Sequence, residues 1–291
     1  MNNLPILVIG FNKPHCLRDL LTFLVRNTNS KVYIHLDGSS QNGKYFDLNQ
    51  ECQRIVKHFS RDNENIISHY SNTNLGGQYG VLSAIDWFFS NEECGLILEE
   101  DITISPSAFD FISVNSNFLR DKEYFGICLF NPIPNMETNF TLNHWVPWGW
   151  ATTKSKWHLF RKEIIDNSFR LQSRSQTNRR ISFPVRYFLN SIISKVDKGE
   201  ISTWDAQLHS WLLTYSYKCI FPAKTLSRHL GHVPQATHAD LVDWWQHLHL
   251  DSHFSSILID SNIEYRNLQF EKLWRMTWWA LVSNTLRKIV R

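Results

Sequence analysis

The amino-acid sequence predicts an α/β protein with a mixed, mainly parallel β-sheet that is flanked by helices. Two observations lead to this fold class. Short apolar runs typical of buried strands alternate with segments whose apolar residues recur at helical spacing. The first of these runs, residues 6–9, is continuous and rich in β-branched residues, as expected of a strand covered on both faces. Strands connected through helices pair in parallel by right-handed crossovers.

The predicted elements alternate along most of the chain. Strands are expected at residues 6–9, 32–36, 66–67, 96–98, 125–130 and 218–221, and helices over residues 17–24, around 55–56, over 81–88 and from Ser202. The segment from Arg161 to Lys198 is polar and poorly periodic, so an irregular excursion such as a lid is expected there.

Composition excludes several classes of protein. A chain of 291 residues with 43% hydrophobic residues can bury a sizeable core, and a net charge of +3 is too small to indicate a nucleic-acid partner. The five cysteines are scattered without metal-binding spacing and read as reduced cytosolic thiols. The N-terminus lacks the basic and long apolar regions of a signal peptide, so a cytoplasmic location is expected.

Three consecutive carboxylates, Glu99, Glu100 and Asp101, stop the fourth apolar run. Buried anions need a countercharge, and Mg²⁺ or Mn²⁺ binds few carboxylates while keeping positions open for phosphate oxygens. This stretch therefore favours a metal site with Asp101 facing a cleft. The alternative is a simple acidic turn into a helix that begins at Ser105 and Pro106, where negative charge suits the helix dipole.

Polar residues also follow the other predicted strands. Asn12, Asp37 and Asn74 would meet Asp101 at one cleft, because ligands lie beyond the carboxyl ends of parallel strands. Gly76 belongs to a glycine turn after Asn74, and neither this turn nor any other segment matches a phosphate-binding loop. Each of these features could alternatively be an ordinary turn.

The second half of the chain adds four candidates. Trp150 lies in an aromatic stretch that could stack on a sugar or a base, or fill the core. Asp205 lies off the apolar stripe of a predicted helix, free to face a cleft or to serve as a first-turn acid. Arg228 could clamp a diphosphate and His238 could complete a metal shell, although no zinc signature is present.

These segments resemble bacterial nucleotide-diphospho-sugar transferases of the GT-A type, often described as haemolytic-protein-like, and more distantly the Golgi N-acetylglucosaminyltransferase I group. The matching segments occur in the family's order over about four-fifths of the chain: ILVIGFNKP, VYIHLDG, SNTNLGG, VLSAIDWFF, LILEEDITISPSAF, WGWAT, WDAQL and FPAKTLSRHLGHVPQATH.

The resemblance implies a GT-A (Rossmann-like) domain over residues 1–240, with a nucleotide-binding half (1–130) and an acceptor half (131–240). It implies a metal-dependent, inverting transfer from a nucleotide-sugar donor, expected to be a UDP-sugar, to a glycan or lipid-linked saccharide in surface polysaccharide synthesis. Asp101 and His238 would bind Mn²⁺ or Mg²⁺, and Asp205 would be the base. The expected donor contacts are Asn12, Asp37, Asn74, Gly76, Glu99, Glu100, Trp150 and Arg228.

The chain departs from the family at Glu100, which replaces an Asp, and at Thr153 to Ser155, where relatives have Trp and two basic residues. A catalytically inactive carbohydrate- or nucleotide-sugar-binding module therefore stays open. A nucleotidyltransferase is less favoured, because no glycine-rich basic loop follows the first strand.

The last fifty residues, 241–291, are expected to form an amphipathic helical extension. Its basic, tryptophan-rich part, residues 268–291, could lie on the inner face of the cell membrane, pack on the protein's own core, or contact a second subunit.

Overall fold

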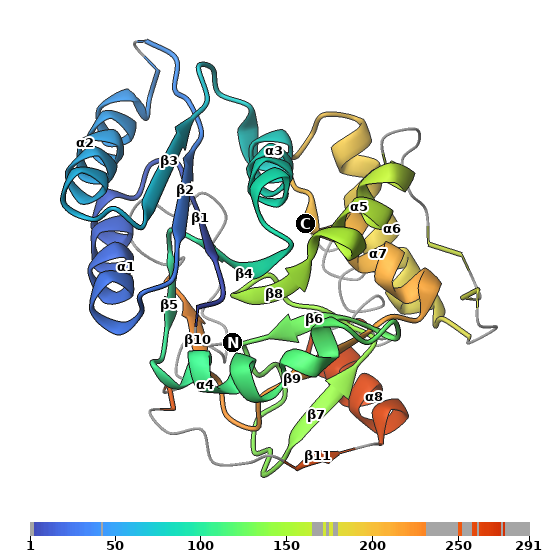
Figure 1. The fold of residues 1–291 in the computed structure, drawn as a ribbon. Helices are drawn as coiled ribbons and strands as arrows, with labels where there is room; N and C mark the ends of the chain where they lie inside the picture. Colours follow the sequence, from blue (N-terminus) through green and yellow to red (C-terminus); the bar gives the residue numbers. More distant parts are fainter. Residues whose placement is uncertain are drawn as a thin grey trace.

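The computed structural model describes residues 3–41, 43–164, 171–172, 175–176, 180–230, 250–251, 258–260, 262–274 and 276. In this part of the chain a nine-stranded mixed sheet runs through the molecule in the order β11-β7-β9-β6-β8-β4-β1-β2-β3, with helices on both faces (Figure 1). A separate pair, β10 and β5, forms a small antiparallel sheet. The predicted α/β fold class is confirmed.

The strands are β1 (Ile6–Gly10), β2 (Val32–Leu36), β3 (Ile66–Tyr70), β4 (Cys94–Glu99), β5 (Ile102–Ile104), β6 (Tyr124–Cys128), β7 (Asn139–Leu142), β8 (Trp150–Thr153), β9 (Lys218–Phe221), β10 (Ser227–His229) and β11 (Ile259–Asp260). The α-helices are α1 (Pro14–Asn27), α2 (Phe46–Asp62), α3 (Gly76–Asn91), α4 (Ser107–Val114), α5 (Lys154–Ile164), α6 (Phe183–Asp197), α7 (Asp205–Tyr215) and α8 (Ile263–Leu273).

The first half of the sheet is parallel and brings three strand ends together. Strand β1 pairs with β2 and with β4, and Gly10 aligns with Leu36 while Ile9 aligns with Glu99. The residues that follow these three strands therefore emerge at the same edge of the sheet. Beyond β4 the sheet becomes mixed, because β8 runs antiparallel to both β4 and β6.

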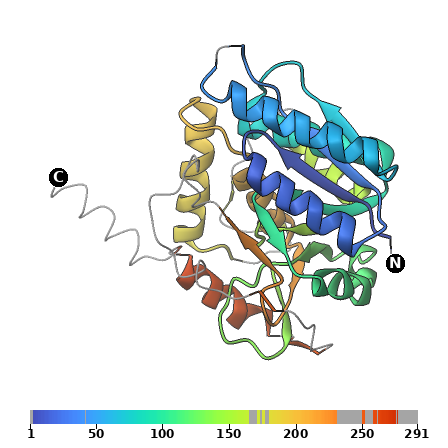
Figure 2. The same ribbon diagram turned by 90° about the vertical axis from the view of Figure 1, so that its left-hand side faces the viewer.

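Each face of the sheet has its own core, because alternate strand residues point to opposite faces. In β1, Ile6 and Val8 pack with α1, α2 and α4, whereas Leu7 and Ile9 pack with α3 and the helices of the second half. Figure 2 shows α1 and α2 side by side on the first face. Each large aliphatic side chain buried in this way contributes about 1.5–3 kcal/mol to folding.

Two predicted segments differ from the structure. The excursion expected from Arg161 to Lys198 contains the regular helix α6, whose buried Val185, Leu189 and Ile193 recur at four-residue spacing. The acidic strand does not lead directly into a helix either, because β5 intervenes and pairs with β10. That pairing joins residues distant in sequence, which explains why local pattern analysis did not find it.

The described part of the C-terminal extension packs on the protein itself. In α8, Phe270 is 1% exposed and its ring stacks on that of Trp274, which follows the helix. Phe270 therefore belongs to the protein's own core, and the partly buried Trp274 packs against that core. The remaining part of the stripe, residues 277–291, lies outside the described residues. Among the described helices, none combines the length and the apolar character needed to cross a bilayer.

Candidate active site

A pocket of about 690 Å³ opens beyond the carboxyl ends of β1, β2 and β4. Its volume lies within the range of ordinary ligand sites. Its walls come from the β1–α1 loop, the acidic end of β4, the start of α3 and the segment before α7. Six carboxylates line it, against one lysine and one histidine: Asp37, Glu99, Glu100, Asp101, Glu200 and Asp205, with Lys13 and His229.

Asp101 is the carboxylate that contacts both basic side chains of the pocket. Its Oδ2 atom accepts a hydrogen bond from the Lys13 ammonium group and lies 3.2 Å from Nε2 of His229. Although burial opposes the effect, His229 and then Lys13 hold the pKa of Asp101 well below its usual range, so this side chain is ionised. Its other oxygen, Oδ1, is buried and has no hydrogen-bond partner among the described residues.

Glu100 holds the loop after β1. Its carboxylate accepts hydrogen bonds from the backbone N–H groups of Phe11 (3.0 Å), Asn12 (3.1 Å) and Lys13 (3.1 Å), which precede or begin the first turn of α1. Burial raises the pKa of Glu100 to about 7, while these N–H donors favour its ionised form. Glu100 lines the pocket, but both of its oxygens already bind the protein's own backbone.

Asp37 holds the loop before α3 in the same way. Its carboxylate accepts from the N–H groups of Gly38 (2.9 Å), Leu75 (3.0 Å) and Gly76 (3.0 Å). Asn74 lies at the same wall, where its side-chain oxygen accepts a second bond from Gly76 N–H at 2.8 Å. The structure thus brings Asp37, Asn74 and Gly76 together, with the two side chains arranged around backbone donors.

Two further predicted residues face the pocket. Asn12 is only 3% exposed, and its Nδ2 donor has no partner among the described residues. A buried amide donor costs free energy unless a ligand or water accepts its hydrogen bond. Glu99 ends β4, and burial and then the charge on Asp101 raise its pKa to about 7, with a smaller effect from Asp205.

Asp205 lines the pocket from a different element, as the first residue of α7. Its Oδ1 atom accepts hydrogen bonds from the Thr203 hydroxyl group at 2.5 Å and from Ala206 N–H at 2.9 Å. Asp101 and Asp205, from separate parts of the chain, therefore line the same pocket. The helix begins at Asp205 rather than at Ser202, and residues 202–204, which precede it, also line the pocket.

Trp150 does not line the pocket. It is 1% exposed and packs among other aromatic rings, including Phe125 at 5.8 Å and Trp145 at 5.2 Å between ring centroids. Its expected contact with a donor is therefore wrong, and the alternative of a core residue describes it. Trp148 lines the pocket instead, with its ring stacked on His229 at 5.4 Å.

Arg228 and His229 are neighbours on β10 and point to different sides. His229 lines the pocket and reaches Asp101, whereas Arg228 is not among the residues that line it. The expected diphosphate contact of Arg228 is therefore not supported by its position, and His229 occupies the place expected for it. His238 lies outside the described residues.

Several residues that line this pocket were not among the predicted site residues, including Lys13, Trp148, Glu200, Thr203 and His229. The position of Lys13 could have been predicted, because this residue directly follows Asn12 after a predicted strand. The Thr203–Asp205 spacing is also typical of a side chain that bonds to a first-turn acid. Trp148 and His229 could not be chosen over their neighbours without knowing which way each strand turns.

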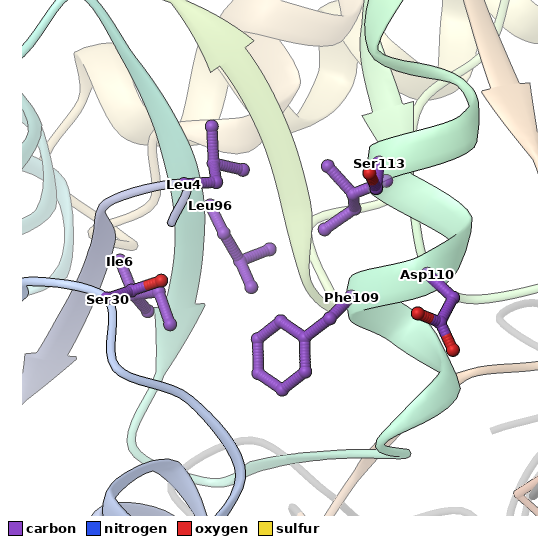
Figure 3. Close-up of a pocket in the computed structure, with 8 residues that line it drawn as sticks. Leu4, Ile6, Ser30, Leu96, Phe109, Asp110 and Ser113 are labelled. Atoms are coloured by element: carbon purple, nitrogen blue, oxygen red, sulfur yellow. The ribbon is translucent and has the colours of Figure 1, made fainter. Parts of the chain in front are cut away.

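A smaller hollow lies at the other edge of the parallel strands (Figure 3). Its volume is about 200 Å³, and its apolar lining comes from Leu4, Ile6, Leu96, Phe109 and Ile112, with Asp110 and Ser113 on α4 beside them. The hollow lies near the beginning of β1 and β4, away from the acidic strand ends. It contains none of the candidate site residues.

No protein-family description matches the chain, and no characterised protein matches it by sequence. Solved structures with a similar arrangement include the mannosyltransferase PcManGT from Pyrobaculum calidifontis, in complex with GDP-Man and Mn²⁺. It is 8% identical, the alignment covers 74% of this chain and 70% of that one, and the TM-score is 0.39.

The glycosyltransferase GlyE of Streptococcus pneumoniae is 12% identical with a TM-score of 0.41, and the alignment covers 75% of this chain but only 45% of GlyE. A 4-diphosphocytidyl-2C-methyl-D-erythritol synthase from Anaerococcus prevotii is 9% identical with a TM-score of 0.38, over 66% of this chain and 97% of that one. All three similarities are distant, so the function is inferred from the residues of the site.

Proposed function

We propose that this protein is a metal-dependent, inverting glycosyltransferase of the GT-A type. It would transfer a sugar from a nucleotide diphosphate, expected to be UDP, to a hydroxyl group of a glycan or lipid-linked saccharide. The observation that carries the proposal is the position of Asp101 and Asp205 on two walls of one pocket. This arrangement leaves space between an acidic donor wall and a carboxylate that can act on an acceptor.

The charges of the pocket support a bound cation. Six carboxylates face one lysine and one histidine, so an anionic diphosphate would be repelled unless a further positive charge accompanied it. Asp101 Oδ1, buried and unpaired among the described residues, is the available protein oxygen. The described residues include no cluster of three or more His, Cys, Asp or Glu that could hold a metal. A single carboxylate oxygen, that of Asp101, fits Mg²⁺ or Mn²⁺, because these ions take one or two carboxylates and complete their shell with phosphate and water.

When bound, the ion would neutralise negative charge on the leaving diphosphate. Lys13 would add a fixed cation at the same wall, and the unpaired Nδ2 of Asn12 would donate a hydrogen bond to the donor. At the start of α7, Asp205 would accept the proton of the acceptor hydroxyl as its oxygen attacks the anomeric carbon. General base catalysis of this kind contributes about 10²- to 10⁴-fold to the rate.

The proposal is tested by measuring thermal unfolding of the full chain with UDP-, GDP-, dTDP- and CMP-sugars, each with and without Mn²⁺. Ligands that bind only the folded protein raise its melting temperature. We expect one nucleotide class to do so, mainly with Mn²⁺, and Asp101→Asn to lose the metal dependence. Asp110→Asn, at the smaller hollow, is the matched control and should keep it.

Release of the free nucleotide is then measured with the nucleotide sugar that binds. Slow hydrolysis of this donor, accelerated by an acceptor saccharide, would support a transferase. Binding without any release would support the inactive binding module instead. If no nucleotide sugar changes the melting temperature, the proposed function is wrong.

A further inference from the structure

The first turn of α3 is capped by side chains from two distant parts of the chain. The N-cap residue, Leu75, makes no side-chain hydrogen bond to the helix. Asp37 instead accepts from Leu75 and Gly76, and the hydroxyl oxygen of Ser202 accepts from the N–H group of Gln78 at 3.0 Å. Free N–H groups at a helix start need such partners. Ser202 therefore supplies part of this cap from the segment before α7.

This contact needs glycine on the helix side. A Cβ atom at Gly77 would lie 2.8 Å from the backbone oxygen of Ser202, and one at Gly76 would lie 3.3 Å from its Oγ atom. A carbon cannot approach a backbone oxygen as closely as 2.8 Å without a shift of one of the two segments. The glycine pair thus permits close approach of the 200–204 segment, in addition to the positive φ of 75° at Gly76.

Both ends of the 200–204 segment are fixed. At its start, just after α6 ends at Asp197, Gly199 adopts φ of 70° and Glu200 N–H bonds back to the carbonyl oxygen of Lys195 at 2.9 Å. At its end, Trp204 is 5% exposed and packs against Trp145 at 5.3 Å between ring centroids. Between these two points, the contact with α3 determines where Ser202 and Thr203 lie.

Thr203 links this contact to the carboxylate on the acceptor wall. It follows Ser202 directly, and its hydroxyl group donates to Asp205. We infer that Gly77 and Ser202 are positioning residues, which hold Asp205 at its working distance from the donor by docking the 200–204 segment onto α3. The inference rests on the proposed function, because it takes Asp205 as the base.

The docking contact is tested first, by hydrogen–deuterium exchange at the Gln78 amide in the full chain. Ser202→Ala removes the acceptor, and we expect exchange about fivefold faster, as for loss of one ordinary hydrogen bond. Ser202→Thr keeps the hydroxyl group and should stay close to wild type. Ser90→Ala is the matched control, because among the described residues the Ser90 hydroxyl bonds only within its own helix, donating to the Trp87 carbonyl oxygen and accepting from Nδ2 of Asn91. Unchanged exchange in Ser202→Ala would overturn the inference.

The consequence for transfer is tested with the nucleotide sugar that binds wild type in the presence of Mn²⁺. Misplacement of a reacting group by about 1 Å can lower the rate about 100-fold. We expect Gly77→Ala to lower kcat by about tenfold to 100-fold, and Ser202→Ala to lower it less. The dissociation constant for the donor should change less than twofold in both, and Ser202→Thr should restore kcat.

Wild-type kcat in both Gly77→Ala and Ser202→Ala would overturn the positioning role, even if Gln78 exchange is faster. A parallel loss of donor affinity and kcat would also overturn it, since that pattern belongs to a wall of the donor site. Failure of the proposed function would show differently, as absence of transfer in wild type, while the exchange experiment would still decide whether Ser202 caps α3.

Discussion

The hydroxyl group of Thr203 donates a 2.5 Å hydrogen bond to Oδ1 of Asp205. A second bond to the same oxygen comes from Ala206 N–H. Among the described residues both bonds go to Oδ1, so Oδ2 stays available to an acceptor hydroxyl group. Two donors on one oxygen also fix the rotation of the carboxylate, and a base must be oriented as well as near.

Replacing Thr203 should therefore slow transfer without weakening donor binding. Thr203→Val keeps the shape of the side chain and removes the hydroxyl group, so we expect kcat to fall about tenfold. Thr203→Ser restores the donor and should recover most of the rate. Steady-state kinetics with a separate measurement of donor binding distinguishes these effects. Equal kcat in the Val and Ser variants would show that the hydrogen bond has no part in transfer.

Glu100 should contribute mainly to folding. Its two carboxylate oxygens accept three backbone N–H groups, and an amide in Glu100→Gln would turn a donor toward at least one of them. An unsatisfied buried polar group costs about 1–3 kcal/mol. Urea unfolding at pH 7 should show a loss of this size. A variant as stable as wild type would mean that Glu100 does not hold the loop before α1.

His35 should make the protein less stable in acid. It is 1% exposed and lies 2.9 Å from Nδ1 of His69 and 3.2 Å from the Ser71 hydroxyl oxygen. Burial, and then the nearby His69, lowers the pKa of His35 to about 4. In the unfolded chain His35 takes up a proton near pH 6.5, whereas in the folded protein it takes one up only near pH 4. The contribution of neutral His35 to the free energy of unfolding is therefore fully present above pH 6.5 and is lost as the pH falls toward 4.

The contribution of His35 is measured by comparing wild type with His35→Gln, which cannot titrate. Between pH 7.5 and pH 5.0 the unfolding free energy of wild type should fall by about 2 kcal/mol more than that of the variant. Urea unfolding at both pH values gives this difference directly. Parallel losses in the two proteins would show that His35 is not the responsible group.

Asp86 should stabilise the fold without affecting transfer. Its carboxylate accepts from Nε1 of the fully buried Trp157 at 2.7 Å and from the Arg161 guanidinium at 2.8 Å. Asp86→Ala leaves the indole N–H unpaired, so we expect a loss of about 1–3 kcal/mol. Thermal unfolding and kcat measured together check this prediction. Loss of activity at temperatures where the variant is fully folded would contradict it.

The sequence predicted the part of the pocket at the strand ends better than the part formed by the segment before α7. Residues 12, 37, 74 and 101 were expected together because each follows a parallel strand or the turn after it. The end of a strand can be located from the local sequence alone. The roles of Glu100 and Asp37 were not predictable in this way. Each carboxylate binds backbone N–H groups of a loop far away in the sequence, and only the folded structure brings them into contact.

Which of two nearby residues faces the pocket depended on the path of the backbone. Trp148 and Trp150 are equivalent in composition, but Gly149 adopts φ of 84° between them, and Trp150 then enters β8 with its ring in the core. Arg228 and His229 are separated by the alternation of β10, a strand that exists only through its pairing with β5. The backbone turn at Gly149 decided the first case and the long-range pairing of β10 with β5 decided the second.

The most direct test of the central claim is Asp205→Asn, assayed with the donor that binds wild type. The asparagine keeps the shape of the side chain but cannot accept a proton. We predict that the donor binds Asp205→Asn with unchanged affinity in the presence of Mn²⁺, while kcat for transfer falls at least about 100-fold. Transfer at the wild-type rate by this variant would contradict the account, because the pocket would then have no base at the position on which the proposed function depends.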